Sequence, residues 1–174
     1  MPQSTTIPGY CRLAGTHRLH HSDDRLGEAY DPASPVHVTL RLRSRDPQGL
    51  DATFRQYASK PHSTRTPAHL TPEEFESRFG SSAEDIAAIE RFAQHHGLTA
   101  TNRSSARRSV EISGPAEKIA KAFKVNLLKC THLGHGYRAV DGDVYVPETL
   151  RDIVVGVFGL DNRPQANPHE FNNT

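Results

Sequence analysis

Residues 70–97 read LTPEEFESRFGSSAEDIAAIERFAQHHG, and this stretch predicts two consecutive helices. Thr71 is placed as the N-cap of the first helix, with Pro72 at its first position and Glu74 three residues after the cap. This is the pattern of a capping box, in which the two side chains accept hydrogen bonds from backbone N–H groups at the helix start. We expect Gly80 to end this helix in the left-handed conformation that glycine adopts easily.

The second helix of the stretch begins after Ser81 and Ser82, which are both suitable N-caps. The acidic residues that follow them favour the positive end of the helix dipole. Gly97 is expected to close this helix, with Leu98 folded back on its last turn as in a Schellman cap. Apolar residues recur at helical spacing and predict one buried face, made of Ile86, Ile89, Phe92 and Ala93.

The segments around these helices predict β-strands. Residues 36–43 alternate apolar and polar side chains, so we expect a strand with one buried face. Residues 98–101 and 107–113 should pair as an antiparallel hairpin, and residues 125–130 should form a fourth strand. Short helices are expected over 48–58 and around 150–155.

A further helix should start at Pro115, where proline suits the first turn. Phe123 of this helix and Phe75 of the first one are both expected in the core. The apolar spacing predicts an inner face made of Ala116, Ile119, Ala120 and Phe123.

The order of these elements, β-α(α)-β-β-α-β, predicts an α+β fold. It is typical of a ferredoxin-like split βαβ sandwich, with an antiparallel four-stranded sheet and helices on one face. Residues 1–35 are polar and lack periodicity, so we interpret them as a flexible N-terminal tail. Residues 36–160 would then be the folded domain, and residues 161–174 a polar linker.

The composition excludes several classes of function. The 21 lysines and arginines nearly balance the 20 acidic residues, so no overall field attracts nucleic acid or an anionic membrane. RNA-recognition domains share this element order, but the strand 107–113 has no aromatic side chain on which a base could stack. No apolar run approaches about 18 residues, and no signal segment is visible after Met1.

Motifs of catalysis and metal binding are absent or incomplete in the sequence. It contains no nucleophile elbow, phosphate-binding loop, dinucleotide-binding motif or zinc-peptidase motif. Cys130, His132 and His135 lack a fourth ligand at metal-site spacing, so we interpret them as hairpin residues. Residues 141–143 suggest a turn rather than a calcium loop. We therefore expect no catalytic residue, metal or cofactor in this chain.

Arginines cluster around the predicted hairpin, at Arg103, Arg107 and Arg108. The favoured interpretation is a solvated sheet edge, because charged side chains discourage edge-to-edge aggregation. The alternative is a surface that docks on an acidic partner.

Several short motifs together resemble the activation domain of the sedolisin–kumamolisin serine-carboxyl peptidases. The resemblance covers most of the chain, and the order and spacing of the motifs are more specific than any one of them. The motifs are LTPEEF at 70–75 with Phe79-Gly80, HGLT at 96–99, SGP at 113–115 with Ala122-Phe123, Tyr137-Arg138, Val146-Pro147, and GLDNRP at 159–164.

The resemblance implies a propeptide that assists folding of a peptidase and inhibits it until autoproteolysis. Such peptidases are acid-active, use a Ser-Glu-Asp triad and bind calcium, all within a secreted catalytic domain that would follow Thr174. The partner implied is that cognate catalytic domain, in cis or in trans. The alternative is a free-standing ferredoxin-like module that binds another protein or a small molecule.

Two groups of candidate functional residues follow. A polar C-terminal segment stiffened by proline could occupy the peptidase cleft with little loss of entropy. Its candidate inhibitory residues are Asp161, Asn162, Arg163, Pro164, Pro168, His169 and Phe171. Histidines within the domain could sense acid, since their ordinary pKa is about 6.5. These candidates are His37, His69, His95, His96, His132 and His135.

Overall fold

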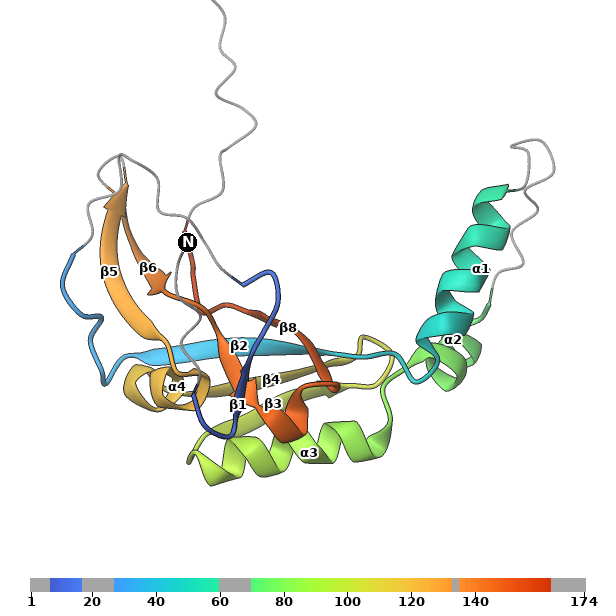
Figure 1. Ribbon diagram of the computed structural model, residues 1–174, viewed down its shortest axis with the longest axis horizontal. Coiled ribbons are helices and arrows are strands. Elements are labelled where there is room, and N and C mark those ends of the chain that lie inside the picture. The colour runs from blue at the N-terminus through green and yellow to red at the C-terminus, as the bar shows by residue number, and fades with distance from the viewer. Residues whose placement is uncertain (1–6, 17–26, 60–69, 133–134, 164–174) are drawn as a thin grey trace, which may run out of the picture.

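The computed structural model describes residues 7–16, 27–59, 70–132 and 135–163 (Figure 1). In chain order the elements are β1 (Tyr10–Arg12), β2 (Pro35–Leu42), α1 (Pro47–Ser59), α2 (Pro72–Phe79), α3 (Ala83–His95), β3 (Thr99–Ser104), β4 (Ser109–Pro115), α4 (Ala116–Phe123), β5 (Asn126–His132), β6 (His135–Asp141), β7 (Tyr145–Pro147), the short 3-10 helix η2 (Glu148–Leu150) and β8 (Val154–Phe158). None of the helices in these ranges is both long and apolar enough to cross a membrane.

The central sheet has the strand order of the predicted ferredoxin-like fold. Its four strands lie in the order β3-β4-β2-β8, and every neighbouring pair is antiparallel. The predicted hairpin of β3 and β4 is confirmed. β2 pairs with β4 from Pro35 opposite Pro115 to Arg41 opposite Ser109, so these two strands form the centre of an α+β sandwich.

The fourth strand of the sheet is not the one that we predicted. β5, which covers the predicted strand, pairs instead with β6 in a separate hairpin. β8 takes the fourth position, where the sequence suggested a helix. It reads VVGVF, and β-branched residues favour strands because they pack well on a pleated surface. Figure 1 shows the β5–β6 hairpin and α1 projecting at opposite ends of the sheet.

One face of the sheet is covered by α3 and α4, as predicted, whereas α1 and α2 lie beyond its end (Figure 1). The rings of Phe92 on α3 and Phe123 on α4 meet edge to face, with centroids 5.6 Å apart. In α4 the inner face differs from the prediction at one position, because Ala122 is buried and Ala120 is only half-buried. The core-facing residues of β2 alternate as expected and are Val36, Val38, Leu40 and Leu42.

The predicted capping box at the start of α2 is confirmed. The Glu74 backbone N donates to Thr71 Oγ1 at 3.2 Å, and the Thr71 backbone N donates to Glu74 Oε2 at 2.9 Å. The predicted conformation at the other end is wrong, because Gly80 has φ −61° and is extended. A Cβ there would lie 2.5 Å from the Glu76 carbonyl oxygen and 2.6 Å from Ser105 Oγ, so close packing requires glycine.

Replacing Thr71 by alanine should cost about 1 kcal/mol of folding free energy, because helix N–H groups lose their cap. The measurement is the urea dependence of unfolding for both proteins. Thr149→Ala, at an exposed threonine outside α2, serves as the control. Equal midpoints for the two variants would show that the box contributes nothing measurable.

The other predictions for α2 and α3 were partly correct. α3 ends in the expected Schellman motif, with Gly97 at φ +62° and the Leu98 backbone N donating to Ala93 O at 2.8 Å. In α2 the core residue is Phe79, which is fully buried, whereas Phe75 is half-buried beside it. The helix is short and lies at the end of the sheet, so only its last turn reaches the core.

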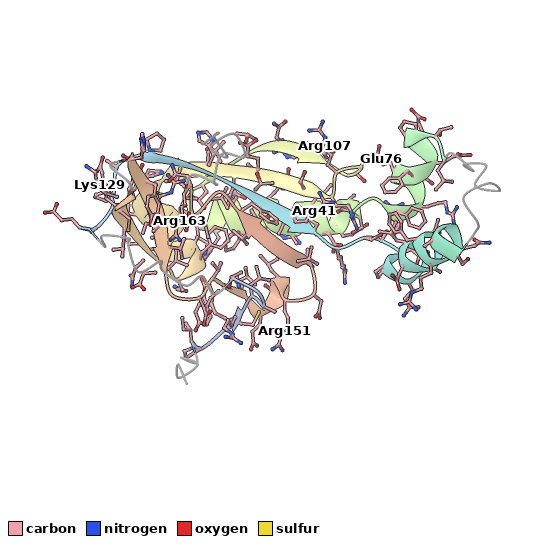
Figure 2. The ribbon with its side chains drawn as sticks, turned by 90° about the horizontal axis from the view of Figure 1, so that it is seen from above. Arg41, Glu76, Arg107, Lys129, Arg151 and Arg163 are labelled. Atoms are coloured by element: carbon pink, nitrogen blue, oxygen red, sulfur yellow. The ribbon has the colours of Figure 1, made fainter. Side chains whose placement is uncertain are left out.

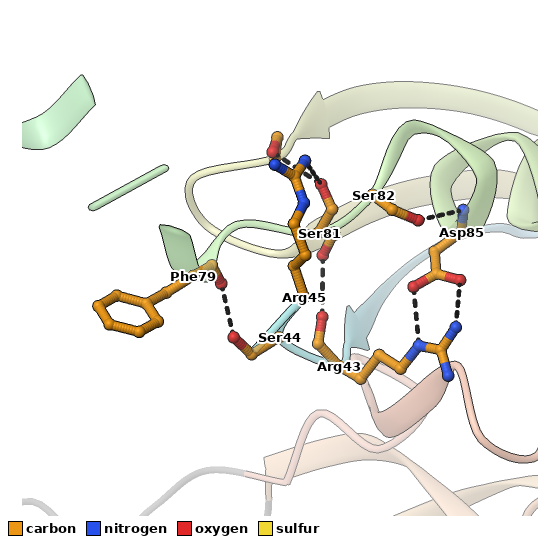
Figure 3. Close-up of polar contacts among 8 residues, drawn as sticks. Arg43, Ser44, Arg45, Phe79, Ser81, Ser82 and Asp85 are labelled. Atoms are coloured by element: carbon orange, nitrogen blue, oxygen red, sulfur yellow. Dashed lines mark hydrogen bonds and ion pairs between the residues drawn. The ribbon is translucent and has the colours of Figure 1, made fainter. Parts of the chain in front are cut away.

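A polar network attaches the junction between α2 and α3 to the end of β2 (Figure 3). Ser44 Oγ donates to Phe79 O at 2.9 Å, and Ser81 Oγ donates to Arg43 O at 3.2 Å. Arg43 also donates to both carboxylate oxygens of Asp85, at 2.9 and 3.0 Å. This hydrogen-bonded ion pair raises the pKa of Arg43. The network therefore sets how α3 enters its position against the sheet.

The interpretation of residues 1–35 as a flexible tail is wrong for its described parts. β1 pairs with β7, with Cys11 opposite Val146, and both Cys11 and Leu13 are buried. Residues 27–30 run beside β5, where the Tyr30 backbone N donates to Leu127 O at 2.9 Å. A three-residue strand has too little periodicity to be seen in sequence, and its partner lies far along the chain.

Candidate functional site

The chain leaves the described fold through residues 159–163, here called the exit segment, which directly follow β8. Leu160 is 3% exposed and belongs to the main core. Gly159 has φ +90°, and a Cβ there would lie 2.6 Å from the His37 carbonyl oxygen. Only glycine fits this turn, which redirects the chain from the edge of the sheet toward the β5–β6 hairpin.

Arg138 of β6 holds the exit segment with its backbone and its side chain. Its Nε donates to Leu160 O at 2.9 Å, and its Nη2 donates to Gly159 O at 2.7 Å. Its backbone N donates to Asn162 Oδ1 at 2.5 Å and its carbonyl accepts from the Asn162 backbone N at 3.0 Å. The guanidinium is buried and lies 5.3 Å from the centre of the Tyr30 ring. These contacts fix the path of the chain up to residue 162.

The described part of the predicted inhibitory linker is also held to the domain. The Arg163 backbone N donates to Asp161 Oδ1 at 2.8 Å, which makes a short turn. The Arg163 guanidinium lies 5.1 Å from the centre of the Tyr137 ring, and Figure 2 places Arg163 beside the β5–β6 hairpin. The other candidates of this group, Pro164, Pro168, His169 and Phe171, lie outside the described residues.

Sequence reasoning did not single out Arg138 as a functional residue. The available signal was its position between Tyr137 and Ala139, which are both buried. A guanidinium in such a run must find acceptors inside the protein, because an unpaired buried charge is very unfavourable. Here the acceptors are carbonyl groups of the exit segment.

Of the residues considered for a metal site, Cys130 and His135 have described side chains, whereas only the backbone of His132 is described. Cys130 is fully buried in a small cluster with Tyr137 and Ala139, whereas His135 is exposed. Both cysteines, Cys11 and Cys130, are free thiols. Over the described ranges, no three His, Cys, Asp or Glu side chains are grouped so that they could hold a metal ion.

The candidate pH-sensing histidines are spread over several elements. His37 is exposed on β2, with its Nδ1 3.6 Å from Glu111 Oε1. His95 and His96 are adjacent at the end of α3, and His135 is exposed on β6. His132 belongs to β5, where only its backbone is described, and His69 lies outside the described residues.

The surroundings of His96 give a clear physical reason for an altered pKa. It is half-buried, and its ring lies edge-on to the Phe92 ring with centroids 4.8 Å apart. Burial lowers the pKa of His96, and the positive charges of His95 and Lys124 lower it further. The folded chain therefore resists protonation at this position.

The pKa of His96 predicts a pH dependence of stability. Because its pKa is lower in the folded state, the unfolded chain binds more protons. The contribution of neutral His96 to the unfolding free energy is fully present above about pH 6.5. It is lost as the pH falls from there toward the pKa of His96 in the folded state. In His96→Gln, the unfolding free energy should therefore decrease less between pH 7.5 and pH 5 than in the wild type. His135→Gln is the exposed control, and identical pH profiles for all three proteins would contradict the prediction.

The second surface of interest is the face of the sheet opposite α3 and α4, here called the open face. Figure 2 looks onto it, with Arg41 toward the end of the sheet nearer α1. β8 places Phe158 and Val155 there or at its rim, and these side chains are 58% and 57% exposed. The polar residues of the open face alternate with core residues along β2 and β4 and are His37, Thr39, Arg41, Ser109, Glu111 and Ser113.

The sequence profile described as "Pro-kumamolisin, activation domain" matches residues 23–163, which include the whole sheet and the exit segment. The chain belongs to the pro-kumamolisin activation domain family. The expected resemblance to propeptides of sedolisin–kumamolisin peptidases is thereby confirmed.

Relatives of this activation domain are peptidases of much greater length. It is 38% identical over 135 residues to Kumamolisin of Bacillus sp. (strain MN-32), covering 77% of this chain and 24% of that protein. It is 29% identical over 150 residues to Xanthomonalisin of Xanthomonas sp. (strain T-22), covering 86% of this chain and 18% of that protein. It is 24% identical over 166 residues to Tripeptidyl-peptidase sed5 of Aspergillus fumigatus, covering 87% and 28%. The chain therefore spans less than a third of each relative.

Proposed function

We propose that this chain acts as the propeptide of an acid-active serine-carboxyl peptidase. In this role it assists folding of the cognate catalytic domain and inhibits it until autoproteolysis separates the two. Membership of the activation domain family supports the assignment. The observation that carries the inhibitory part is the attachment of the exit segment to Arg138.

The attachment matters because it defines where the following residues begin. Residues beyond 163 start from a point held by core packing at Leu160 and by hydrogen bonds at Asn162. Pro164 and Pro168 then restrict the backbone of the sequence that follows. A segment with a fixed start and few accessible conformations loses less entropy when it enters a cleft. Residues 164–174 are therefore suited to inhibit a peptidase by occupying its active site.

The open face supplies a surface on which the domain can hold its partner. Two large apolar side chains are more than half exposed on or beside it, among polar residues that can form hydrogen bonds. Such an arrangement resembles a protein interface more than an ordinary solvated surface. We propose that the catalytic domain packs here while the C-terminal segment reaches its cleft.

The chemistry of the precursor belongs to the catalytic domain in this proposal. The Ser-Glu-Asp triad and the calcium site are expected there, and this chain is not catalytic by itself. The precursor would be secreted, and the domain would bind its peptidase in cis or in trans but neither nucleic acid nor membrane. A free-standing module with an unrelated partner is not favoured, because the named relatives are peptidases.

The test is inhibition in trans of the cognate mature peptidase by the isolated chain. At neutral pH the full chain should inhibit, and deletion of residues 164–174 should weaken inhibition at least about tenfold, a loss of 1.4 kcal/mol of binding energy. Deletion of residues 1–6 is the control and should have little effect. Comparable effects of the two deletions would rule out the cleft-occupying role.

A further inference from the structure

A cleft of about 300 Å³ lies where β2 passes into α1, at one end of the open face. Its apolar walls include Leu50 and Phe54 of α1 and Val155 of β8, while Arg41 and Arg108 supply positive charge. We call these five residues the arginine cleft. Phe54 and Val155 are 63% and 57% exposed, although both are large apolar side chains. In Figure 2, α1 stands beyond the end of the sheet that carries Arg41.

Two arginines of the cleft lack a carboxylate partner among the described residues. The other charged groups that line it are already paired, Arg43 with Asp85 at 2.9 Å and Asp51 with Arg55 at 2.6 Å. The Nε–H group of Arg108 is buried, and no described group accepts a hydrogen bond from it. Burial and repulsion from Arg41 lower the pKa of Arg108. Two adjacent cations and an unsatisfied buried donor are unfavourable until an anion joins them.

The backbone of Arg108 is an independent observation. Its φ is +51°, in the left-handed region, and its N donates to Ser105 O at 2.9 Å to close the turn between β3 and β4. Glycine or asparagine adopts this conformation at lower cost than arginine. In the described ranges Lys124 is the other non-glycine residue with positive φ, and its ammonium group lies over the Tyr10 ring at 4.6 Å. Strain retained at a residue suggests that its side chain has a function.

We propose that the arginine cleft binds an aspartate or glutamate side chain of the peptidase domain between Arg41 and Arg108. An apolar residue next to that carboxylate would pack on Phe54 and Val155. Guanidinium groups suit this task, because their fixed N–H donors match the geometry of a carboxylate. The identity of the partner rests on the proposed function, whereas the carboxylate chemistry rests on the cleft itself. Of the arginines that cluster at the hairpin, this proposal places Arg108 in the interface with the peptidase domain.

The experiment compares the full chain with Arg41→Gln and Arg108→Gly in trans inhibition of the cognate mature peptidase. Each variant should weaken inhibition about 10- to 100-fold, the range expected for one hydrogen bond to a charged group. Arg107→Gln is the matched control, since Arg107 is an exposed arginine on the same turn, and it should inhibit like the wild type. Inhibition by the wild type should also weaken more steeply with sodium chloride than inhibition by Arg41→Gln.

Arg108→Gly separates binding from folding. Glycine relieves the left-handed strain, so its melting temperature should equal or exceed that of the wild type while its inhibition is weaker. If both cleft variants inhibit as strongly as the wild type, the proposed binding role of the arginine cleft is overturned. The proposed function then remains intact.

If the wild-type chain does not inhibit, the proposed function is refuted. A peptide titration then tests whether the arginine cleft binds a carboxylate. The probes are acetyl-Leu-Asp-Leu-amide and its asparagine counterpart, followed by the NMR signals of the arginine Nε–H groups. Shifts of Arg41 and Arg108 with the aspartate peptide alone support carboxylate binding. Shifts with both peptides, or with neither, overturn it.

Discussion

Phe123→Ala should lower the free energy of unfolding by about 3–5 kcal/mol. The side chain is fully buried on α4 and meets the Phe92 ring of α3 edge to face. Removing it deletes the ring contact between the two helices that cover the sheet. The cavity left behind would close only in part, because both helices are also fixed to the strands beneath them.

A matched control for this substitution is Phe54→Ala, since Phe54 is 63% exposed. We expect that variant to change stability by less than about 1 kcal/mol. Chemical denaturation of both proteins provides the measurement. Similar losses from the two alanine substitutions would mean that the contact between α3 and α4 is not central to the fold.

The second large effect is expected from Arg138→Met, which keeps the length of the side chain but removes its donors. The carbonyl groups of Gly159 and Leu160 would lose their partners, so stability should fall by about 2–4 kcal/mol. The exit segment would no longer be held at those positions. Inhibition of the cognate peptidase should therefore weaken even under conditions where the variant remains folded.

Arg151→Met is the control for this variant, because Arg151 is an exposed arginine directly after η2. It should change neither the denaturation midpoint nor the inhibition constant. If folded Arg138→Met inhibits as strongly as the wild type, the attachment of the exit segment has no role in inhibition.

The predictable parts of the fold were those with strong local signals. The capping box at Thr71, the alternation of residues 36–42 and the Schellman cap at Gly97 depend on neighbours a few residues apart. Strand pairing depends on distant partners. For that reason β5 was placed in the sheet position that β8 occupies, and β1 was not recognised at all.

The candidate site also has a part that local sequence signals indicate and a part that depends on distant residues. The GLDNRP motif pointed to the exit segment through its resemblance to a family, but no local pattern linked it to Arg138, more than 20 residues earlier in the chain. The arginine cluster at the hairpin was visible in the sequence as two alternatives. The proposal that Arg108 docks on an acidic group draws on the position of Arg41, the apolar wall from α1 and the backbone conformation of Arg108.

The position of β8 has a consequence for biosynthesis. β2 lies at the centre of the sheet, yet its outer neighbour β8 ends at Phe158, immediately before the exit segment. During translation one edge of β2 must wait for the last strand, and pairing across such a long intervening chain is slow. The ribosome therefore synthesises β8 and the exit segment in direct succession. We therefore expect the sheet to be completed and the exit segment to be positioned at the same late stage of synthesis.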